Sequence, residues 1–485
     1  MSNKREIIIL AALSCALAAI PFLVVNFPPI IDLPQHVAQV RLFGEAISNP
    51  ASPYRIQWIT PYSLVYAVLG GNWLIFGPIN AGRMGMLMIV VFWVIMLHLL
   101  SYKMKRPALA ASLASILFFG HILYWGFYQF AFGWPLFIGW ILLSKTEFQT
   151  RWKEGLVFFL ASIILYMAHI FWFLVAVGWL VVRHLILKGD LKRLMIRVAA
   201  ASPLILLGLV WYPSLGAYGF ISQTIWATTP FERLFSAWLV DATFGGIKGS
   251  IEYIVFGLLI VWIVVACLQN RKDLLSKLDR ELVVISALFM LLAFILPDKQ
   301  TNTIRFCQRW VPPALAFLLI GLPSPRLKKS MLTGVVVVIV AGFLLLTSWQ
   351  WIAFERTELS GLKESLAVLP QTPKVLGLSY IKDSPIVRGR PFIQTFAYSQ
   401  VLKGGELNFS FADFGPSLVV YRERRLPPWT PELEWFPEKA KKSDLLFFDY
   451  ALLNADEKLH AAASSNQVLK PLTKGGRWRC YKVGR

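Results

Sequence analysis

The stretch IIILAALSCALAAIPFLVV runs from Ile7 to Val25 without a charged residue. A helix needs about 20 apolar residues to cross the hydrocarbon core of a bilayer. The stretch is too long for the apolar part of a secretory signal peptide, and no A-x-A cleavage site follows it. We therefore predict a retained membrane-spanning helix over roughly Ile7–Phe27.

Ten further apolar stretches follow, so the predicted fold is an α-helical polytopic membrane protein with about eleven transmembrane helices. The chain is 56% hydrophobic and only 15% charged, whereas a soluble chain is about 25% charged. The further stretches are Met84–Tyr102, Leu109–Trp125, Phe130–Ser144, Leu156–Ala168, Phe171–Leu187, Val198–Trp211, Ile251–Leu268, Leu282–Leu296, Val311–Leu322 and Met331–Trp351.

The net charge of +21 comes from Lys and Arg at the ends of apolar stretches. We therefore expect membrane lipids as partners and no nucleic acid. Loops on one side hold 20 basic residues and loops on the other side hold 8. By the positive-inside rule this asymmetry predicts a cytoplasmic N-terminus.

Two segments leave the number of spans open. If Tyr62–Phe76 spanned, Lys103, Lys105 and Arg106 would lie outside, so we favour an interfacial or re-entrant helix there. Residues 156–187 read either as two helices or as one long tilted helix. The charges of residues 188–197 and 270–281 favour two.

The composition changes at about Arg356. Predicted strands and helices alternate from there, which indicates a small extracytoplasmic α/β domain over residues 356–485, after a transmembrane domain over residues 1–355 with a first outer loop at 28–82. The predicted strands are Lys374–Tyr380, Ser417–Tyr421, Asp444–Asp449 and a hairpin at Val468–Val483, and the predicted helices are Leu359–Leu369 and Asp456–Ala463.

The outer segment after the first helix carries Asp32 and His36, with Pro34 suited to a first helical turn. In one interpretation Asp32 caps the helix that begins there, and His36 faces water. In the other, Asp32 points into a cavity as a general base, with His36 beside it as a polar or metal-binding group.

A second polar cluster contains Lys299, Arg305 and Arg309 on the outer side, where positive charge is otherwise scarce. Arginine suits bidentate phosphate binding. The alternative is that these side chains extend to lipid headgroups at the membrane surface.

The order of these features resembles the GT-C superfamily of membrane glycosyltransferases, which includes protein O-mannosyltransferases and aminoarabinose transferases. The likeness rests on the early acid Asp32, the segment PYSLVY at Pro61–Tyr66, the segment FGPINAGR at Phe76–Arg83, and RFCQRWVPP at Arg305–Pro313. Tail segments at Tyr398–Gly405 and Gly476–Tyr481 look like those of uncharacterised bacterial members. Many members carry an acidic pair in this loop, whereas here Leu33 follows Asp32. A second carboxylate must therefore be Glu45 or come from elsewhere.

The resemblance implies transfer of a sugar from a polyprenyl-phosphate donor to an acceptor hydroxyl at the outer face of the cytoplasmic (inner) membrane. It implies Asp32 as the base, with Arg83, Arg305, Arg309 and Lys299 as candidates for binding the phosphate and His36 as a secondary polar or metal-binding candidate. Asp32, Arg83 and Arg305 occupy positions like those of the family. Whether a divalent metal takes part stays open, and no other cofactor is expected.

Two other functions remain open. A transporter or flippase of a lipid-linked substrate would often show repeated halves, and we see no internal repeat. A non-catalytic scaffold of the cell envelope would use the outer domain to bind a partner.

Overall fold

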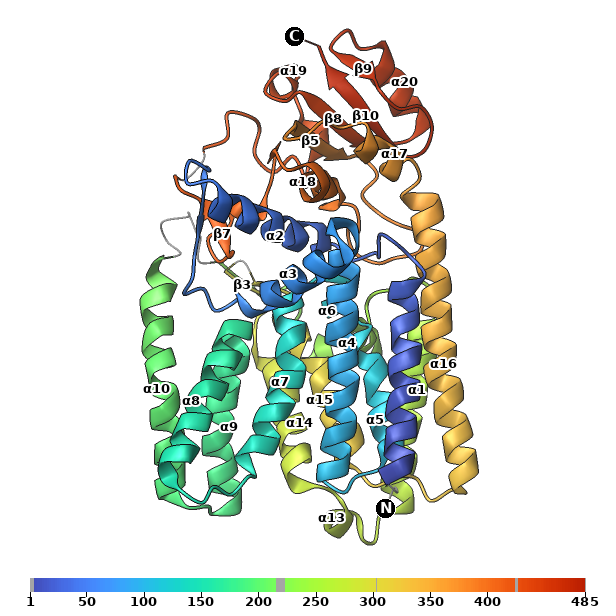
Figure 1. Ribbon diagram of the computed structural model, residues 1–485. Helices are drawn as coiled ribbons and strands as arrows, with labels where there is room; N and C mark the ends of the chain where they lie inside the picture. Colours follow the sequence, from blue (N-terminus) through green and yellow to red (C-terminus); the bar gives the residue numbers. More distant parts are fainter. Residues whose placement is uncertain (1–3, 215–222, 302, 424–425, 485) are drawn as a thin grey trace. The chain divides into compact units, whose positions relative to one another are not determined.

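The structure is a computed structural model that describes residues 4–214, 223–301, 303–423 and 426–484 (Figure 1). It divides into two compact units. The first unit comprises Met1–Pro21, Leu87–Leu123 and Phe127–Ser348. The second unit comprises Phe22–Met86, Tyr124–Gly126 and Trp349–Arg485.

Seven helical segments among the described residues are long and apolar enough to cross a membrane. Together with the fold they make the chain an integral, multi-pass membrane protein. The predicted count of eleven spans stays a prediction. The seven segments are α1 (Lys4–Leu23), α4 (Pro78–Lys103), the run from α5 (Ala108–Ser115) to α6 (His121–Trp125), α9 (Ile170–Leu187), α10 (Leu191–Ser214), α12 (Ile251–Gln269) and α16 (Lys329–Ala353) with the π-helix that follows it (Phe354–Glu358).

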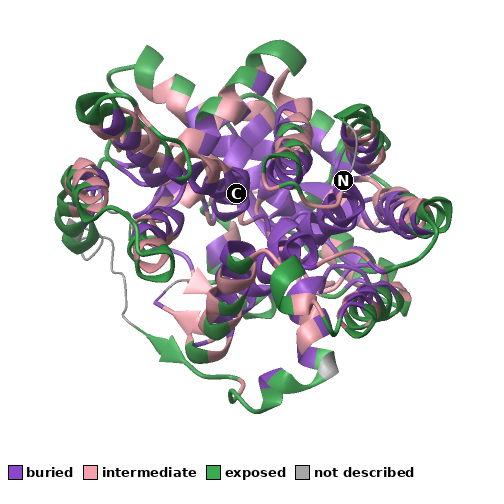
Figure 2. Ribbon diagram, turned by 90° about the horizontal axis from the view of Figure 1, so that it is seen from below, coloured by how far each residue is buried: buried purple, intermediate pink, exposed green. Residues whose placement is uncertain are grey.

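Further helices complete the first unit. They are α7 (Tyr128–Ser144), α8 (Arg151–Ala168), α11 (Ser236–Thr243), α13 (Leu274–Lys277), α14 (Arg280–Ile295) and α15 (Val311–Gly321). Helix α14 packs against α15, and α8, α9 and α10 pack on one another (Figure 1). Several helices seen end-on in Figure 2 are buried on one side and exposed on the other, as expected of helices that face lipid on their outer side.

The structure divides residues 156–187 into two helices, α8 and α9, as the loop charges favoured. The break falls at His169, whose backbone is extended. Its ring Nδ1 accepts a hydrogen bond from the backbone N–H of Phe171 at 3.1 Å and so caps α9.

Aromatic side chains form part of the core of the first unit. The rings of Trp172 and Trp310 lie 5.3 Å apart, and Phe130 and Phe289 pack against both. Both Trp rings are buried. These aromatics therefore belong to the packed interior and not to an interfacial belt.

The second unit contains the first outer loop and the tail. Helix α2 (Leu33–Ser48) begins at the predicted place, and α3 (Leu64–Phe76) covers the segment predicted to be interfacial. Strand β1 (Tyr54–Ile56) pairs antiparallel with β7 (Val419–Tyr421), with Tyr54 opposite Tyr421. This pairing joins two segments that lie far apart in the sequence.

The tail holds a five-stranded mixed sheet in the order β6-β5-β8-β10-β9. Strand β5 is parallel to β6 and β8, and β10 is antiparallel to β8 and β9. The strands are β5 (Lys374–Ser379), β6 (Glu406–Leu407), β8 (Tyr450–Asn454), β9 (Leu469–Pro471) and β10 (Trp478–Val483), and the helices are α17 (Leu362–Ala367), α18 (Tyr398–Lys403), α19 (Lys442–Leu445) and α20 (Glu457–Ser465). The predicted small C-terminal α/β region is confirmed, whereas the boundary at 355/356 stays a prediction.

One predicted strand is wrong. Asp444–Asp449 begins inside α19, and the strand starts only at Tyr450. The carboxylate of Asp444 accepts hydrogen bonds from the backbone N–H groups of Lys441 and Thr430. These bonds hold the backbone in a helical turn where the apolar sequence alone suggests extension.

Candidate functional site

Asp32 occupies the N-cap position of α2, as the sequence suggested, but its carboxylate makes no capping hydrogen bond to the helix. The residue is half-buried, and its backbone is in the helical region and not extended. Capping therefore does not account for the acidic side chain at this position.

The backbone on which Asp32 sits is fixed by residues 124–126. The N–H of Ile31 donates to Tyr124 O at 2.9 Å, and the N–H of Asp32 donates to Trp125 O at 3.2 Å. Gly126 has φ +82°, and a Cβ there would stand 2.8 Å from Asp32 N. The close approach therefore requires glycine.

His36 lies one helical turn after Asp32, on the same face of α2. Its ring Nδ1 lies 3.0 Å from the hydroxyl of Tyr66, and its ring meets that of Phe411 edge-on with centroids 5.1 Å apart. It is buried and does not face water. Burial lowers the pKa of His36 to about 3, against a hydrogen bond to the Gly126 backbone that raises it, so the imidazole is neutral at physiological pH.

Arg83 lies in the first turns of α4, beside α2. A Cβ on the preceding Gly82 would stand 2.5 Å from Leu33 Cδ1, so the two helix starts touch where Gly82 leaves room. The Arg83 guanidinium donates to Val25 O, and its Nε donates to Asn80 Oδ1 at 3.0 Å. Some of the N–H groups of Arg83 thus hold the backbone at Val25, where the outer loop begins.

Glu355 accepts hydrogen bonds at the same point, from the N–H groups of Asn26 at 2.8 Å and Phe27 at 3.0 Å. Tyr398 packs edge-on against Phe27 with ring centroids 4.8 Å apart. Burial and the nearby Glu355 raise the pKa of the Tyr398 hydroxyl, while Arg83 opposes the rise. Arg83, Glu355 and Tyr398 therefore act electrostatically on one another around residues 25–27.

The second predicted cluster lies in the first unit. Arg305 forms an ion pair with Asp241 at 2.8 Å, and its backbone has φ +50°, a strained conformation for a residue other than glycine. Lys299, in the short strand β3 (Lys299–Gln300), donates to Gln223 Oε1 at 3.1 Å.

Arg309 is buried, with its guanidinium carbon 3.7 Å from the centroid of the Phe127 ring. Its guanidinium also donates to Ile304 O at 2.9 and 3.2 Å. A buried side chain held in this way does not extend to lipid headgroups.

A buried ion pair connects this cluster to the loop that precedes α12. Arg233 is fully buried, pairs with Asp298 at 2.9 Å, and donates to the carbonyl groups of Ala293 and Leu296. Asp298 also accepts from the backbone N–H groups of Ala227 and Thr228. The network fixes the segment that carries Lys299, Arg305 and Arg309.

The structure thus brings Asp32, His36 and Arg83 together in the second unit, and places Lys299, Arg305 and Arg309 in the first. Sequence reasoning missed the roles of Glu355, Tyr398 and residues 124–126, because these roles depend on contacts between distant segments; Tyr398 was noted only as the start of a family-like tail segment. The described part of the chain holds no group of three or more His, Cys, Asp or Glu side chains arranged to bind one metal ion.

One comparison with solved structures shows the fold. The sequence matches neither a family model nor a curated protein. The crystal structure of ArnT from Cupriavidus metallidurans bound to undecaprenyl phosphate superimposes with a TM-score of 0.57 at 11% identity, over 99% of this chain and 98% of that one. The same protein in the apo state gives a TM-score of 0.46 at 11% identity, over 98% and 97%. The chain has the GT-C-like fold of the first of these structures, as its sequence predicted.

Proposed function

We propose that this membrane protein transfers a sugar from a polyprenyl-phosphate donor to an acceptor hydroxyl at the outer face of the cytoplasmic membrane. The observation that carries the proposal is the likeness, along nearly the whole chain, to a structure that holds undecaprenyl phosphate. The placement of Asp32 also supports the proposal. Residues 124–126, far away in the sequence, hold its backbone, and its carboxylate does not cap α2.

In the proposed reaction Asp32 is the general base. An acceptor hydroxyl is a weak nucleophile, so its proton must leave as its oxygen attacks the anomeric carbon. The bond between that carbon and the phosphate oxygen breaks, and the lipid phosphate leaves with the electron pair. The proton passes to the Asp32 carboxylate. His36 is neutral and buried beside it, which suits a group that positions without adding charge.

The leaving phosphate develops negative charge that fixed cations stabilise without reorganising. We propose Arg83 for this task, because it lies in the same unit as Asp32. The role of Arg305, Arg309 and Lys299 on the phosphate stays a prediction from the sequence. Arg83 and Arg305 keep part of their side chains exposed, and both are held by hydrogen bonds or an ion pair. A guanidinium held in this way loses little entropy when it binds an anion.

Complementation of a deletion strain tests the proposal, with mass spectrometry of the envelope glycans as the readout. We expect Asp32→Asn to reduce the glycosylated product by at least about 100-fold, in line with loss of a general base. Glu364→Gln, which removes an exposed acid from α17, should leave the product unchanged. Both variants should be present in the membrane at the level of the natural protein.

Full activity of Asp32→Asn would remove the general base from the proposal. Movement of a lipid-linked sugar across proteoliposomes, with no new glycosidic product, would instead assign a flippase. Complementation that needs the tail but not Asp32 would assign an envelope scaffold.

A further inference from the structure

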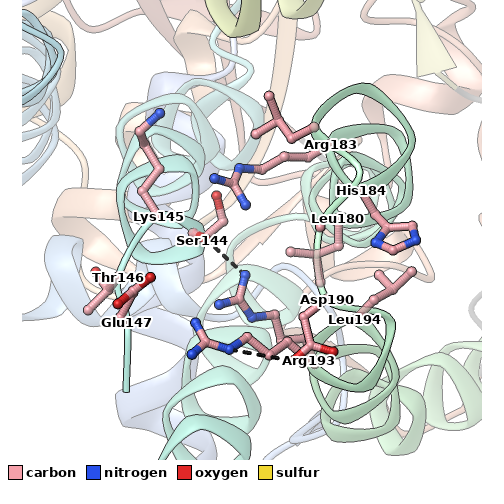
Figure 3. Close-up of a pocket in the computed structure, with 13 residues that line it drawn as sticks. Ser144, Lys145, Thr146, Glu147, Leu180, Arg183, His184, Asp190, Arg193 and Leu194 are labelled. Carbon is pink, nitrogen blue, oxygen red and sulfur yellow. Dashed lines mark hydrogen bonds and ion pairs between the residues drawn. The ribbon is translucent and has the colours of Figure 1, made fainter. Parts of the chain in front are cut away.

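A cleft of about 360 Å³ opens in the first unit between the end of α7, the end of α9 and the start of α10 (Figure 3). Its lining includes four basic side chains, Lys145, Arg183, Arg193 and Arg197. The residues of the proposed transfer reaction do not line it, so the cleft needs a separate explanation.

Two of these cations are neutralised by short ion pairs. Lys145 Nζ lies 2.8 Å from Glu281, and Arg197 lies 2.7 Å from Glu154. Arg197 also donates to Ser144 O at 2.8 Å. Both side chains therefore have strong partners in the protein.

The other two cations are different. Arg183 Nε is 3.5 Å from Glu281 Oε2, and Arg193 Nε is 3.8 Å from Asp190 Oδ2, distances too long for hydrogen bonds. Among the residues that the structure describes, neither guanidinium donates a hydrogen bond, and Arg183 Nε is buried without an acceptor. In Figure 3 both groups reach from α9 and α10 toward residues 144–147. Each guanidinium carries five donors.

The cleft also lies where membrane-spanning helices end. Helices α9 and α10 are both long and apolar enough to span, and the turn between them is at the mouth of the cleft. Leu185, Leu187 and Leu191 are exposed around that turn. Exposed apolar side chains lie here beside guanidinium groups whose N–H donors have no acceptor among the described residues. This combination suits a molecule with an acyl chain and an anionic headgroup better than it suits a small soluble anion.

We propose that this cleft binds the phosphate-bearing headgroup of an anionic phospholipid, with Arg183 and Arg193 as the donors and the acyl chains along the exposed side of α9 and α10. Basic pockets between transmembrane helices bind such headgroups. The acids Glu147 and Asp190 also line the cleft, and because both are exposed to water their repulsion of an anion is weakened but not abolished. The site is distinct from the proposed sugar transfer and does not depend on it.

Native mass spectrometry of the purified full chain tests this site by counting bound phosphatidylglycerol against phosphatidylcholine. A basic residue near an anionic lipid contributes about fivefold in affinity, so Arg183→Gln with Arg193→Gln should weaken phosphatidylglycerol binding about 30-fold. The matched control, Arg151→Gln with Lys272→Gln, removes the same charge outside the cleft and should bind like the natural protein. Equal binding by the two double variants would overturn the proposal.

Glu147→Gln gives a second test. It breaks no ion pair of the described residues and removes only a carboxylate that lines the cleft and repels an anion. It should tighten phosphatidylglycerol binding and leave phosphatidylcholine binding unchanged, and the absence of any gain would count against the site.

Inorganic phosphate separates the two sources of the anion. If millimolar phosphate raises the thermal midpoint of the delipidated natural protein but not of the cleft double variant, and displaces the lipid, the site belongs to a free anion and the lipid proposal fails.

Discussion

At the scale of the residue, the position of Asp32 depends on Gly126. The left-handed backbone of Gly126 lets residues 124–126 lie directly on Ile31 and Asp32. A Cβ at Gly126 would come within 2.8 Å of Asp32 N and 3.0 Å of Asp32 Cβ, closer than such contacts are found. The glycine therefore fixes an acid that lies far from it in the sequence.

We predict that Gly126→Ala lowers sugar transfer strongly while the protein still folds, because it moves Asp32 by a fraction of an ångström. Misplacement on this scale costs up to about 100-fold in rate. Gly475→Ala is the control, since Gly475 also has a positive φ but no atom within 4 Å of the added Cβ. Product formation and thermal midpoint are measured for both. If the two variants lose product in equal measure, backbone strain and not Asp32 explains the effect.

The sequence predicted the chemistry of single residues better than their partners. Asp32 and His36 were identified because a polar pair follows a proline turn at the end of a membrane span. The partner of His36, Tyr66, lies in a segment noticed for its apolar length and its family likeness, and neither feature indicates a contact with His36. Glu355 and residues 124–126 gave no signal, because nothing in their local sequence indicates which distant backbone they bind.

At the scale of the element, α2 is held by the tail through amide side chains. Gln39 accepts from Val419 N at 2.8 Å and donates to Val419 O at 3.0 Å, as a backbone partner would. Gln35 accepts from Phe411 N at 3.0 Å and donates to Gln394 Oε1 at 2.8 Å. Both glutamines are buried, so loss of either leaves polar groups without partners and costs about 1–3 kcal/mol for each. The tail thus fixes the helix that presents Asp32.

The turn that carries Glu434 should make the tail sensitive to pH. Burial raises the pKa of Glu434 to about 7, and the nearby Glu432 and Asp413 add to the rise. The folded protein keeps this proton up to about pH 7, whereas the unfolded chain loses it near pH 4.5. The unfolded chain therefore binds fewer protons between these values, and stability falls as pH rises through this window, by up to about 3 kcal/mol.

Glu434→Gln removes this titration. We expect the thermal midpoint of the natural protein to fall more between pH 5 and pH 8 than that of the variant. Glu364→Gln, an exposed acid, should behave like the natural protein. Parallel pH profiles for all three proteins would show that Glu434 is ionised in the folded state.

The long helices were predictable because apolar length is a local property, and their ends fall within about seven residues of the expected places, with the largest differences at the starts of α4 and α10. The short strands could not be predicted from the sequence. Strand β1 and the strands β2 (Thr224–Ile225), β3 and β4 (Thr303–Ile304) span two or three residues each, too few for a periodic pattern. Strands β1, β2 and β3 exist because a distant segment supplies hydrogen-bond partners, whereas β4 pairs with the neighbouring strand β3.

At the scale of the whole molecule, the pairing of β1 with β7 constrains the membrane topology. Strand β1 lies in the loop after α1, and β7 lies in the tail, so this loop and the tail must be on the same side of the membrane. Helix α1 carries the chain across to that side. With α1 as a membrane span, we predict that the N-terminus and the tail lie on opposite sides, with an odd number of crossings. Eleven crossings satisfy this condition, and the charge asymmetry indicates that the tail is outside.

Cysteine labelling tests this topology in a background where Cys15, Cys267, Cys307 and Cys480, all free thiols, are replaced by serine. Lys474→Cys lies in the exposed turn before β10, and Lys272→Cys lies in the exposed turn after α12. We expect a membrane-impermeant maleimide to label position 474 in intact spheroplasts, and position 272 only after permeabilisation, because the charge asymmetry predicts that the basic loop lies in the cytoplasm. Labelling of both positions in intact spheroplasts would place the basic loops outside with the tail. It would also remove the outer-face location from the proposed reaction, since α2 and Asp32 share the side of the tail.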